Sequence, residues 1–299
     1  MDYKIVTDGS CDLPPELCME KQVDVVPFYV SFDSETYQKE IAEIPIRDFY
    51  EQMVANPTMF PKSSMPSVQD YVDVFQPIVE EGKAIICICI TTKFSGSYQS
   101  AMNAKEIILE SVPDAQITVL DSTINTVLQG IFVLEAIKMY EAQLPYETVI
   151  ERLESIKSTG RIFFTVGNID YLKHGGRIGK LAGIAGSMLG IRPLITLKEG
   201  EIFPSGLARS RKKSLEKVYE LLWQYLQEVH AKPETYSICV GYGYDIAEAE
   251  EFRKGAVHYL NAKGYVIADA ELSKYQIGAT ISVHTGPYPL GFGVIKKGM

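Results

Sequence analysis

"AIICICI", residues 84–90, is followed directly by "TTKFSGSYQSA", residues 91–101, and this pair of segments decides the fold class. An unbroken apolar run of this length is typical of a strand that is buried on both faces, as in a parallel sheet. The hydroxyl-rich segment leads into 96–112, which has the apolar spacing of an amphipathic helix. A strand, a loop and a helix in this order predict a parallel sheet covered by helices.

The same alternation of strands and helices continues on both sides of this segment. Short apolar runs bounded by turn residues predict strands, and runs with helical spacing predict the helices between them. The strands are expected at 3–6, 23–32 and 115–122, and the helices at 46–55, 68–82, 126–143 and 146–158. Strands that alternate with helices indicate an α/β fold, a parallel sheet with helices on both faces.

The pattern of the sequence changes near residues 158–162. The remaining elements are predicted as a strand at 161–168, a glycine-rich segment at 169–190, a hairpin at 192–206, helices at 211–230 and 247–264, strands at 236–243 and 265–272, and a strand–loop–strand unit at 280–295. We therefore expect two domains, an N-terminal α/β domain over residues 1–160 and a second α/β domain over residues 161–299.

The composition is that of a soluble globular protein with a full-sized core. The 299 residues are 46% hydrophobic and 22% charged. The net charge is 29 − 38 = −9, which disfavours nucleic acid as a partner, because affinity for phosphate backbones comes mainly from Lys and Arg. Every predicted helix is needed to cover a sheet, so no amphipathic helix is left to form an interface between subunits. We therefore expect a monomer.

Cysteine usage and the N-terminal sequence favour a cytoplasmic location. The five cysteines are odd in number and show no CxxC or Cys/His metal spacing, so neither a disulfide framework nor a metal site is expected. The start "MDYKIVTDGS" lacks the basic and apolar regions of a signal peptide. The most membrane-like stretch, 181–197, is interrupted by Arg192 and is too short to span a bilayer, so no integral membrane segment is predicted.

The segment 91–101 lies where open α/β sheets bind ligands, at the carboxyl end of a predicted strand. The next helix begins near Ser97, so its free N–H groups face the loop, and the Ser95 and Ser97 hydroxyls add donors. These features suit a carboxylate or a phosphate, and helix capping by serine is the alternative. A nucleophile elbow is disfavoured because Lys93 and Phe94 precede Ser95 in place of the G-x-S-x-G pattern.

Other segments carry further polar candidates. Asp8 and Asp12 in "TDGSCDLPPE" would act on a ligand or a metal, although such residues more often fix a turn and cap a helix. "KSSMPS", residues 62–67, is a serine loop before a predicted helix. His284 ends a predicted strand beside Thr285 and could donate to an anion, although a lone histidine is usually structural.

The glycine-rich segment 173–183, "KHGGRIGKLAG", is similar to a phosphate-binding loop without matching it. Leu181 stands where Ser or Thr is needed, and the spacing is one residue short, so nucleotide binding by this route is rejected. Arg177, placed among the glycines, is interpreted as an exposed charged contact or simply as a surface arginine.

Taken in order, these segments resemble the DegV family of fatty-acid-binding proteins, which includes the FakB-like lipid-carrying component of bacterial fatty acid kinase. The resemblance is carried over nearly the whole chain by "IVTDGSCDLP", "KSSMPS", "FSGSYQSA", "VLDS", "YLKHGGRIG" and "HTGPYPLG". It implies a two-domain fold with a lipid tunnel at the domain interface. It also implies a bound long-chain fatty acid as the ligand, no cofactor, and no catalysis by this chain.

The chain departs from the family pattern at several positions. Gly9 and Ser10 follow Asp8 where the family usually has Ser-Thr, and "SSMPS" replaces the usual Thr-Ser-Gln-Pro-Ser. Leu128 and Tyr288 stand where the family commonly has glycine. Both add bulk that could change the shape of the pocket, so the preferred chain length of the fatty acid stays open.

The resemblance places the fatty acid carboxylate at the residues that match the family's motifs. These are Ser63 and Ser64, Ser95 and Gly96, and His284 and Thr285. A carboxylate that leaves water needs several hydrogen bonds, which hydroxyls, backbone N–H groups and a helix N-terminus can supply.

The resemblance also implies a protein partner. A separate ATP-dependent kinase subunit would phosphorylate the bound carboxylate, and Arg177 matches the arginine that is linked to docking of this subunit in the family. A second basic segment, 208–213, is interpreted as the solvated start of a helix.

Two enzyme hypotheses compete with the carrier. The first is a serine-dependent acyl hydrolase that uses Ser95 and His284, which would need a third, orienting group such as Asp8 or Asp121. The second is a small-molecule kinase, which is disfavoured because the sequence has no phosphate loop and no cluster of metal ligands.

Overall fold

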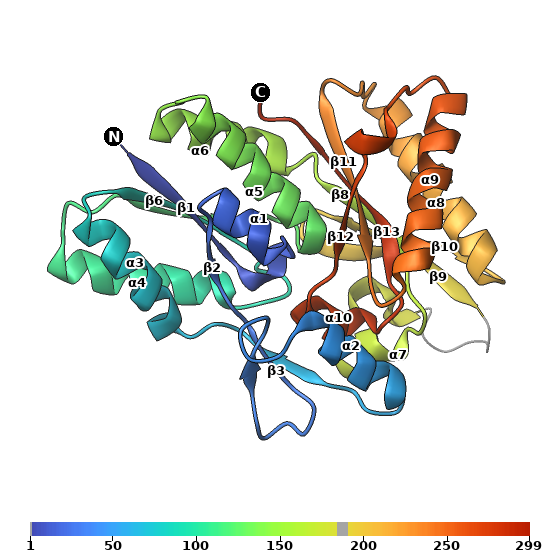
Figure 1. The fold of residues 1–299 in the computed structure, drawn as a ribbon, viewed down its shortest axis with the longest axis horizontal. Helices are drawn as coiled ribbons and strands as arrows, with labels where there is room; N and C mark the ends of the chain where they lie inside the picture. Colours follow the sequence, from blue (N-terminus) through green and yellow to red (C-terminus); the bar gives the residue numbers. More distant parts are fainter. Residues whose placement is uncertain (1, 184–190) are drawn as a thin grey trace.

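The computed structural model describes residues 2–183 and 191–299, and its first layer is a parallel sheet (Figure 1). The strand order is β2-β1-β6-β7, and each neighbouring pair is parallel. The strands are β1 (Tyr3–Asp8), β2 (Asp24–Val26), β6 (Ala84–Cys89) and β7 (Ile117–Asp121). The prediction from the apolar run at 84–90 is confirmed.

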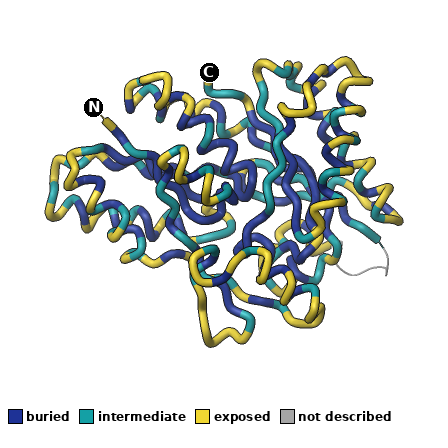
Figure 2. Tube along the Cα trace, viewed as in Figure 1, coloured by how far each residue is buried: buried dark blue, intermediate teal, exposed yellow. Residues whose placement is uncertain are grey.

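Strand β6 is buried on both faces because its side chains alternate between two cores. Cys87 and Cys89 pack in a core with α3 and α4, whereas Ile86 and Ile88 point into a core that contains α5 and α6. The four helices are α3 (Val68–Glu80), α4 (Ser97–Ser111), α5 (Thr126–Glu141) and α6 (Tyr146–Lys157). Figure 2 shows the strands of this sheet as a buried layer between them. Double burial explains why apolar residues occupy every position of the strand.

The second layer is a six-stranded, mostly antiparallel sheet in the order β10-β9-β8-β13-β11-β12. Only the β11–β12 pair is parallel among its described strands. Helices α8 and α9 cover one face, and α5 covers the other. The bounds are β8 (Arg161–Thr165), β9 (Arg192–Lys198), β10 (Glu201–Ala208), α8 (Arg211–Glu228), β11 (Tyr236–Tyr242), α9 (Ile246–Ala262), β12 (Ser273–Gln276) and β13 (Leu290–Lys296).

Helix α5 fills the space between the two sheets (Figure 1). Side chains all round it are buried, including Val127, Phe132 and Met139, as expected for a helix inside a core. One hydrophobic core therefore runs from the first sheet to the second. The boundary predicted near 158–162 falls between α6 and β8, and its status as a domain boundary stays a prediction.

A third, small sheet corrects the prediction of one strand at 23–32. Its order is β4-β3-β5, with β3 (Tyr29–Ser31), β4 (Gln38–Lys39) and β5 (Lys62–Ser64). The predicted strand is broken at Pro27, so that β2 joins the parallel sheet and β3 joins the small one. Proline has no N–H to donate to a sheet, which favours a break there. Three further helices are α1 (Pro15–Glu20), α2 (Ile46–Ala55) and α7 (Asp170–His174).

The predictions near the C-terminus were wrong in two places. Residues 265–272 form no strand, and β12 begins only at Ser273. Residues 280–285 belong to helix α10 (Ala279–Thr285), which lies between Gly278 and Gly286. Its β-branched residues favour strands by propensity, and its burial on nearly all sides removes the apolar periodicity that would have indicated a helix.

None of the helices in the described ranges is long and apolar enough to cross a membrane. In the membrane-like stretch 181–197, residues 184–190 lie outside the described residues, and residues from Arg192 onward form strand β9.

The close approach of α5 to the loop after β1 makes a prediction about stability. A Cβ atom added at Gly130 would lie 2.4 Å from the carbonyl oxygen of Cys11. We expect Gly130→Ala to lower the free energy of unfolding by about 1–3 kcal/mol, because the two segments must separate. Chemical denaturation of the wild-type and variant proteins would measure this difference in the free energy of unfolding. Glu141→Ala, at the exposed end of the same helix, should change the value by less than about 0.5 kcal/mol. Equal stability of the two variants would contradict the packing described.

Candidate functional site

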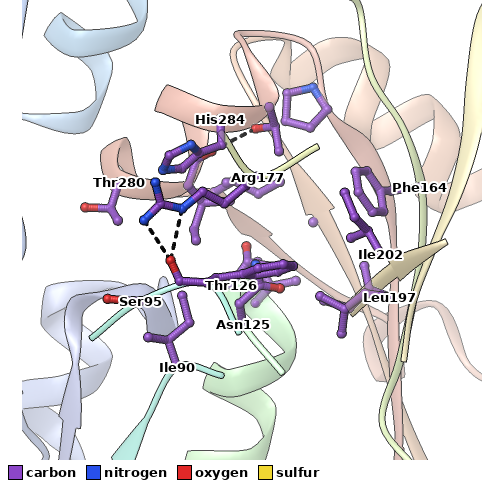
Figure 3. A pocket seen from close by; sticks show the side chains of 18 of the residues that line it. Ile90, Ser95, Asn125, Thr126, Phe164, Arg177, Leu197, Ile202, Thr280 and His284 are labelled. Atoms are coloured by element: carbon purple, nitrogen blue, oxygen red, sulfur yellow. Dashed lines mark hydrogen bonds between the residues drawn. The ribbon is translucent and has the colours of Figure 1, made fainter. Parts of the chain in front are cut away.

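A cavity of about 260 Å³ lies between α10, the loop after β6 and the inner face of the six-stranded sheet. Its walls are mainly apolar, with Ile90, Phe164, Leu197 and Ile202 among the lining residues (Figure 3). The polar side chains that border it include Ser63, Ser64, Ser95, Asn125, Arg177 and His284. A concave, mainly apolar space with a few convergent polar groups is typical of a small-molecule site.

The loop after β6 places Ser95 at the cavity. The Thr91 N–H donates to the carbonyl of Ile124, and the Phe94 N–H donates to the carbonyl of Thr91, so the chain turns sharply after the strand. The Ser95 hydroxyl accepts a hydrogen bond from the Ser97 N–H at 3.2 Å. The cap residue of α4 is Gly96, which makes no side-chain capping bond, so Ser95 lies one residue before the cap and borders the cavity.

Asp8 holds this loop in place through hydrogen bonds and does not line the cavity. The fully buried carboxyl group accepts hydrogen bonds from the Ile90 N–H, the Ser97 hydroxyl and the Gln129 amide at 2.8–2.9 Å. Burial raises the pKa of Asp8 to about 6, against the effect of these hydrogen bonds. The structure therefore gives Asp8 a structural part in the turn.

His284 lies in the last turn of α10 and faces β5. Its Nε2 atom is 3.2 Å from the Ser63 hydroxyl, and its buried Nδ1 atom has no hydrogen-bond partner among the described residues. Gly175 packs against the imidazole so closely that a Cβ there would lie 2.1 Å from Nδ1. Burial, together with the positive charges of Arg177 and Lys62, lowers the pKa of His284 to about 3, so the ring is neutral near pH 7.

Arg177 crosses the mouth of the cavity, between His284 and Ser95 (Figure 3). Its Nε and Nη2 atoms donate to the carbonyl of Phe94 at 3.0 and 2.9 Å, and Nη1 donates to the carbonyl of Gly175 at 3.0 Å. The side chain is therefore both exposed and held in place. It joins the glycine-rich segment to the Ser95 loop, a position that its sequence neighbours do not reveal.

A pair of buried carboxyl groups lies behind α10. Glu40 accepts hydrogen bonds from the Phe28 and Thr280 N–H groups, and Asp12 accepts one from the Thr126 hydroxyl. Burial raises the pKa of Glu40 to about 7 and also raises that of Asp12. These contacts hold the start of α10, and hence His284, against the N-terminal half of the chain.

The structure brings together the residues that the sequence resemblance singled out, with two exceptions. Ser63, Ser64, Ser95, Gly96, His284 and Thr285 all border the cavity, as does Arg177. Leu128 and Tyr288 do not: Leu128 is buried against Gly293, and Tyr288 packs on Gly167. Neither side chain therefore lies in the pocket wall, and the effect of their bulk on the preferred chain length of the fatty acid stays open.

The site does not assemble the triad that a serine hydrolase needs. In the part of the chain that is described, His284 pairs with Ser63 rather than with Ser95, and no carboxylate reaches Nδ1. Asp121, one candidate for the orienting group, instead accepts a hydrogen bond from Thr92. The described ranges also contain no group of His, Cys, Asp and Glu residues able to hold a metal ion.

Several polar residues of the cavity escaped sequence reasoning. Asn125, Thr126 and Thr280 border the cavity, and Glu40 braces α10 from outside it. Asn125 and Thr126 follow the predicted strand end at 122 within about one turn of chain, so the rule that flagged Ser95 could also have flagged them. Nothing local marks Thr280 or Glu40, because their contacts join distant parts of the chain.

Over nearly its whole length, the chain is similar to several known proteins. A family model described as "Uncharacterised protein, DegV family" matches residues 2–297. A DegV domain-containing protein of Clostridium perfringens is 29% identical over 297 residues, which is 99% of this chain and 100% of that protein. Among solved structures, a stearic-acid-binding protein from Eubacterium ventriosum is 44% identical, with a TM-score of 0.93 and 99% of each chain covered. A fatty-acid-binding DegV family protein from Thermus thermophilus is 29% identical, with a TM-score of 0.84, covering 99% of this chain and 100% of that one.

The environment of His284 predicts its titration. Because its pKa is lowered to about 3, the ring should stay neutral from about pH 8 to pH 5, where an ordinary histidine takes up a proton. The unfolded chain does take up that proton, so this group should make the protein less stable as the pH falls below about 6.5. Proton NMR of the ring signals, assigned with His284→Gln, would measure the titration. A midpoint near 6.5 would contradict the burial of the ring.

Proposed function

This chain belongs to the DegV family, and on that premise we propose that it binds a long-chain fatty acid in the cavity, with the carboxylate at Ser63, Ser95 and His284. The observation that carries the proposal is an apolar cavity that ends in hydroxyl groups beside the Arg177 cation, with the charge of Lys62 also acting on His284. The solved relatives from Eubacterium ventriosum and Thermus thermophilus, described as a stearic-acid-binding and a fatty-acid-binding protein, support it.

The polar end of the cavity has the chemistry that a carboxylate needs. In the tautomer with a proton on Nε2, His284 donates to the Ser63 oxygen, which leaves the Ser63 hydroxyl proton free to donate to the ligand. Ser95 supplies a second hydroxyl beside the first turn of α4. Burial is the largest cause of the lowered pKa of His284, and the positive charges of Arg177 and Lys62 add to it. These charges would stabilise a carboxylate, because they disfavour a cation and favour an anion.

The apolar part of the cavity would supply most of the affinity. Each buried methylene contributes up to about 0.8 kcal/mol, so a tail of roughly fifteen could gain on the order of 12 kcal/mol before ordering costs. The tail would lie against Phe164, Leu197 and Ile202 of the six-stranded sheet. The carboxylate would then stay near the mouth, beside Arg177.

We further propose that the protein carries the fatty acid without transforming it. Because the chain resembles FakB-like proteins, we expect it to present the carboxylate to a separate ATP-dependent kinase subunit, which would form the acyl phosphate. Arg177 is the proposed docking contact, since part of its side chain is exposed at the mouth and its guanidinium group is fixed by two carbonyls. We place this carrier in the cytoplasm as a monomer. Its five cysteines are free and buried, as is usual in a reducing compartment.

Binding by the hydroxyl groups can be tested with serine variants. We expect purified protein to contain a fatty acid that solvent extraction and mass spectrometry identify. Ser63→Ala and Ser95→Ala should each weaken rebinding by about tenfold, because each removes a hydrogen bond to a charged group. Ser155→Ala, which changes an exposed hydroxyl on α6 that does not line the cavity, is the matched control. A purified protein that contains no fatty acid and binds none when it is added would contradict the proposal.

The docking role of Arg177 needs a separate measurement. Protein already loaded with fatty acid is mixed with a fatty acid kinase catalytic subunit and ATP, and acyl phosphate formation is followed. We expect Arg177→Ala to reduce the rate at low protein concentration by about tenfold or more, as for a lost interface arginine. Arg209→Ala changes an exposed arginine in the basic segment 208–213 and should leave the rate unchanged. Equal rates of acyl phosphate formation for both variants would show that Arg177 does not contribute to docking.

A further inference from the structure

Asn125 places an unpaired amide at the cavity. The residue is only 9% exposed, borders the cavity, and directly precedes α5. Its side chain makes no capping bond to the helix and no other hydrogen bond with the described residues. Figure 3 draws Asn125 and Thr126 on the side of the cavity across from His284 and Arg177.

This arrangement is unusual for asparagine before a helix. In that position the side chain normally accepts a hydrogen bond from an N–H of the first turn, which stabilises the helix. Here the next residue, Thr126, has a φ of 51°, in the left-handed region that β-branched residues rarely adopt. The Thr126 hydroxyl donates to Asp12 at 2.5 Å, which holds this backbone turn in place.

The cavity that Asn125 borders is mainly apolar. Its lining residues include Ile90, Val127, Gly241, Ile277 and Phe292, together with the hydroxyl-bearing Thr126 and Thr280. An acyl chain that fills the cavity would bury this amide without a partner, which is unfavourable, whereas an apolar residue of similar size at this position would avoid that cost. The amide therefore points to a ligand that can bond with it.

From this geometry we propose that the preferred ligand is an acyl chain that carries an oxygen, as a hydroxyl or a keto group, part-way along its length. The proposal rests on the fatty acid binding proposed above. An amide both donates and accepts hydrogen bonds, so Asn125 can pair with either kind of oxygen. With the carboxylate held at Ser63, Ser95 and His284, Asn125 would bind the chain oxygen at a second polar position.

The test compares octadecanoic acid with a positional series of monohydroxy-octadecanoic acids, by calorimetric titration of the delipidated protein. We expect at least one isomer to bind the wild-type protein about fivefold or more tightly than octadecanoic acid, the gain of one net hydrogen bond. Asn125→Leu should lose this preference and should bind octadecanoic acid at least as tightly as the wild type. Asn103→Leu, on the exposed side of α4, should keep the wild-type preference.

The outcomes separate the two proposals. If the wild-type protein binds octadecanoic acid at least as tightly as every hydroxylated isomer, the inference about Asn125 is overturned and fatty acid binding stands. If the wild-type protein binds none of these acids, the proposed function itself fails. The wild-type series decides the question even if Asn125→Leu does not fold. Retention of the isomer preference by a folded Asn125→Leu protein would also overturn the role of this side chain.

Discussion

The cavity depends on the buried carboxyl group of Asp8, at the point where β1 ends. Hydrogen bonds from Ile90, Ser97 and Gln129 converge on it, one each from the residue after β6, the start of α4 and the first turn of α5. Leaving any of these buried groups unpaired would cost stability, so the three elements are held in one arrangement. The Ser95 loop lies between two of these anchors, and its place at the cavity follows from them.

Some polar groups around the cavity have hydrogen-bond partners within the protein, and others have none. Arg177 belongs to the first kind, because carbonyl oxygens of Phe94 and Gly175 accept its hydrogen bonds. Asn125 belongs to the second kind, since its amide faces an apolar space without a partner. The first kind shapes the mouth, and the second kind shows where a ligand could complete the hydrogen bonding.

The segments that could be predicted were those whose local pattern and final environment agree. The run at 84–90 became a doubly buried parallel strand, and the predicted helix at 46–55 matches α2 (Ile46–Ala55). The run at 23–32 was misjudged because its two halves pair with different sheets, and only the whole fold separates them. Helix α10 was misjudged because its neighbours bury nearly every side of a short β-branched segment.

The sequence by itself determined the fold class and the hydroxyl-rich strand end that carries Ser95, because both follow from the order and spacing of neighbouring residues. The tertiary structure alone decided which polar groups meet. Ser63 and His284 are 221 residues apart in the chain and pair only because β5 and α10 pack together. Likewise, Arg177 reaches the carbonyl of Phe94, and Asn125 turns toward the cavity, through contacts with distant segments. Such contacts depend on how whole elements pack, and no local pattern of residues encodes them.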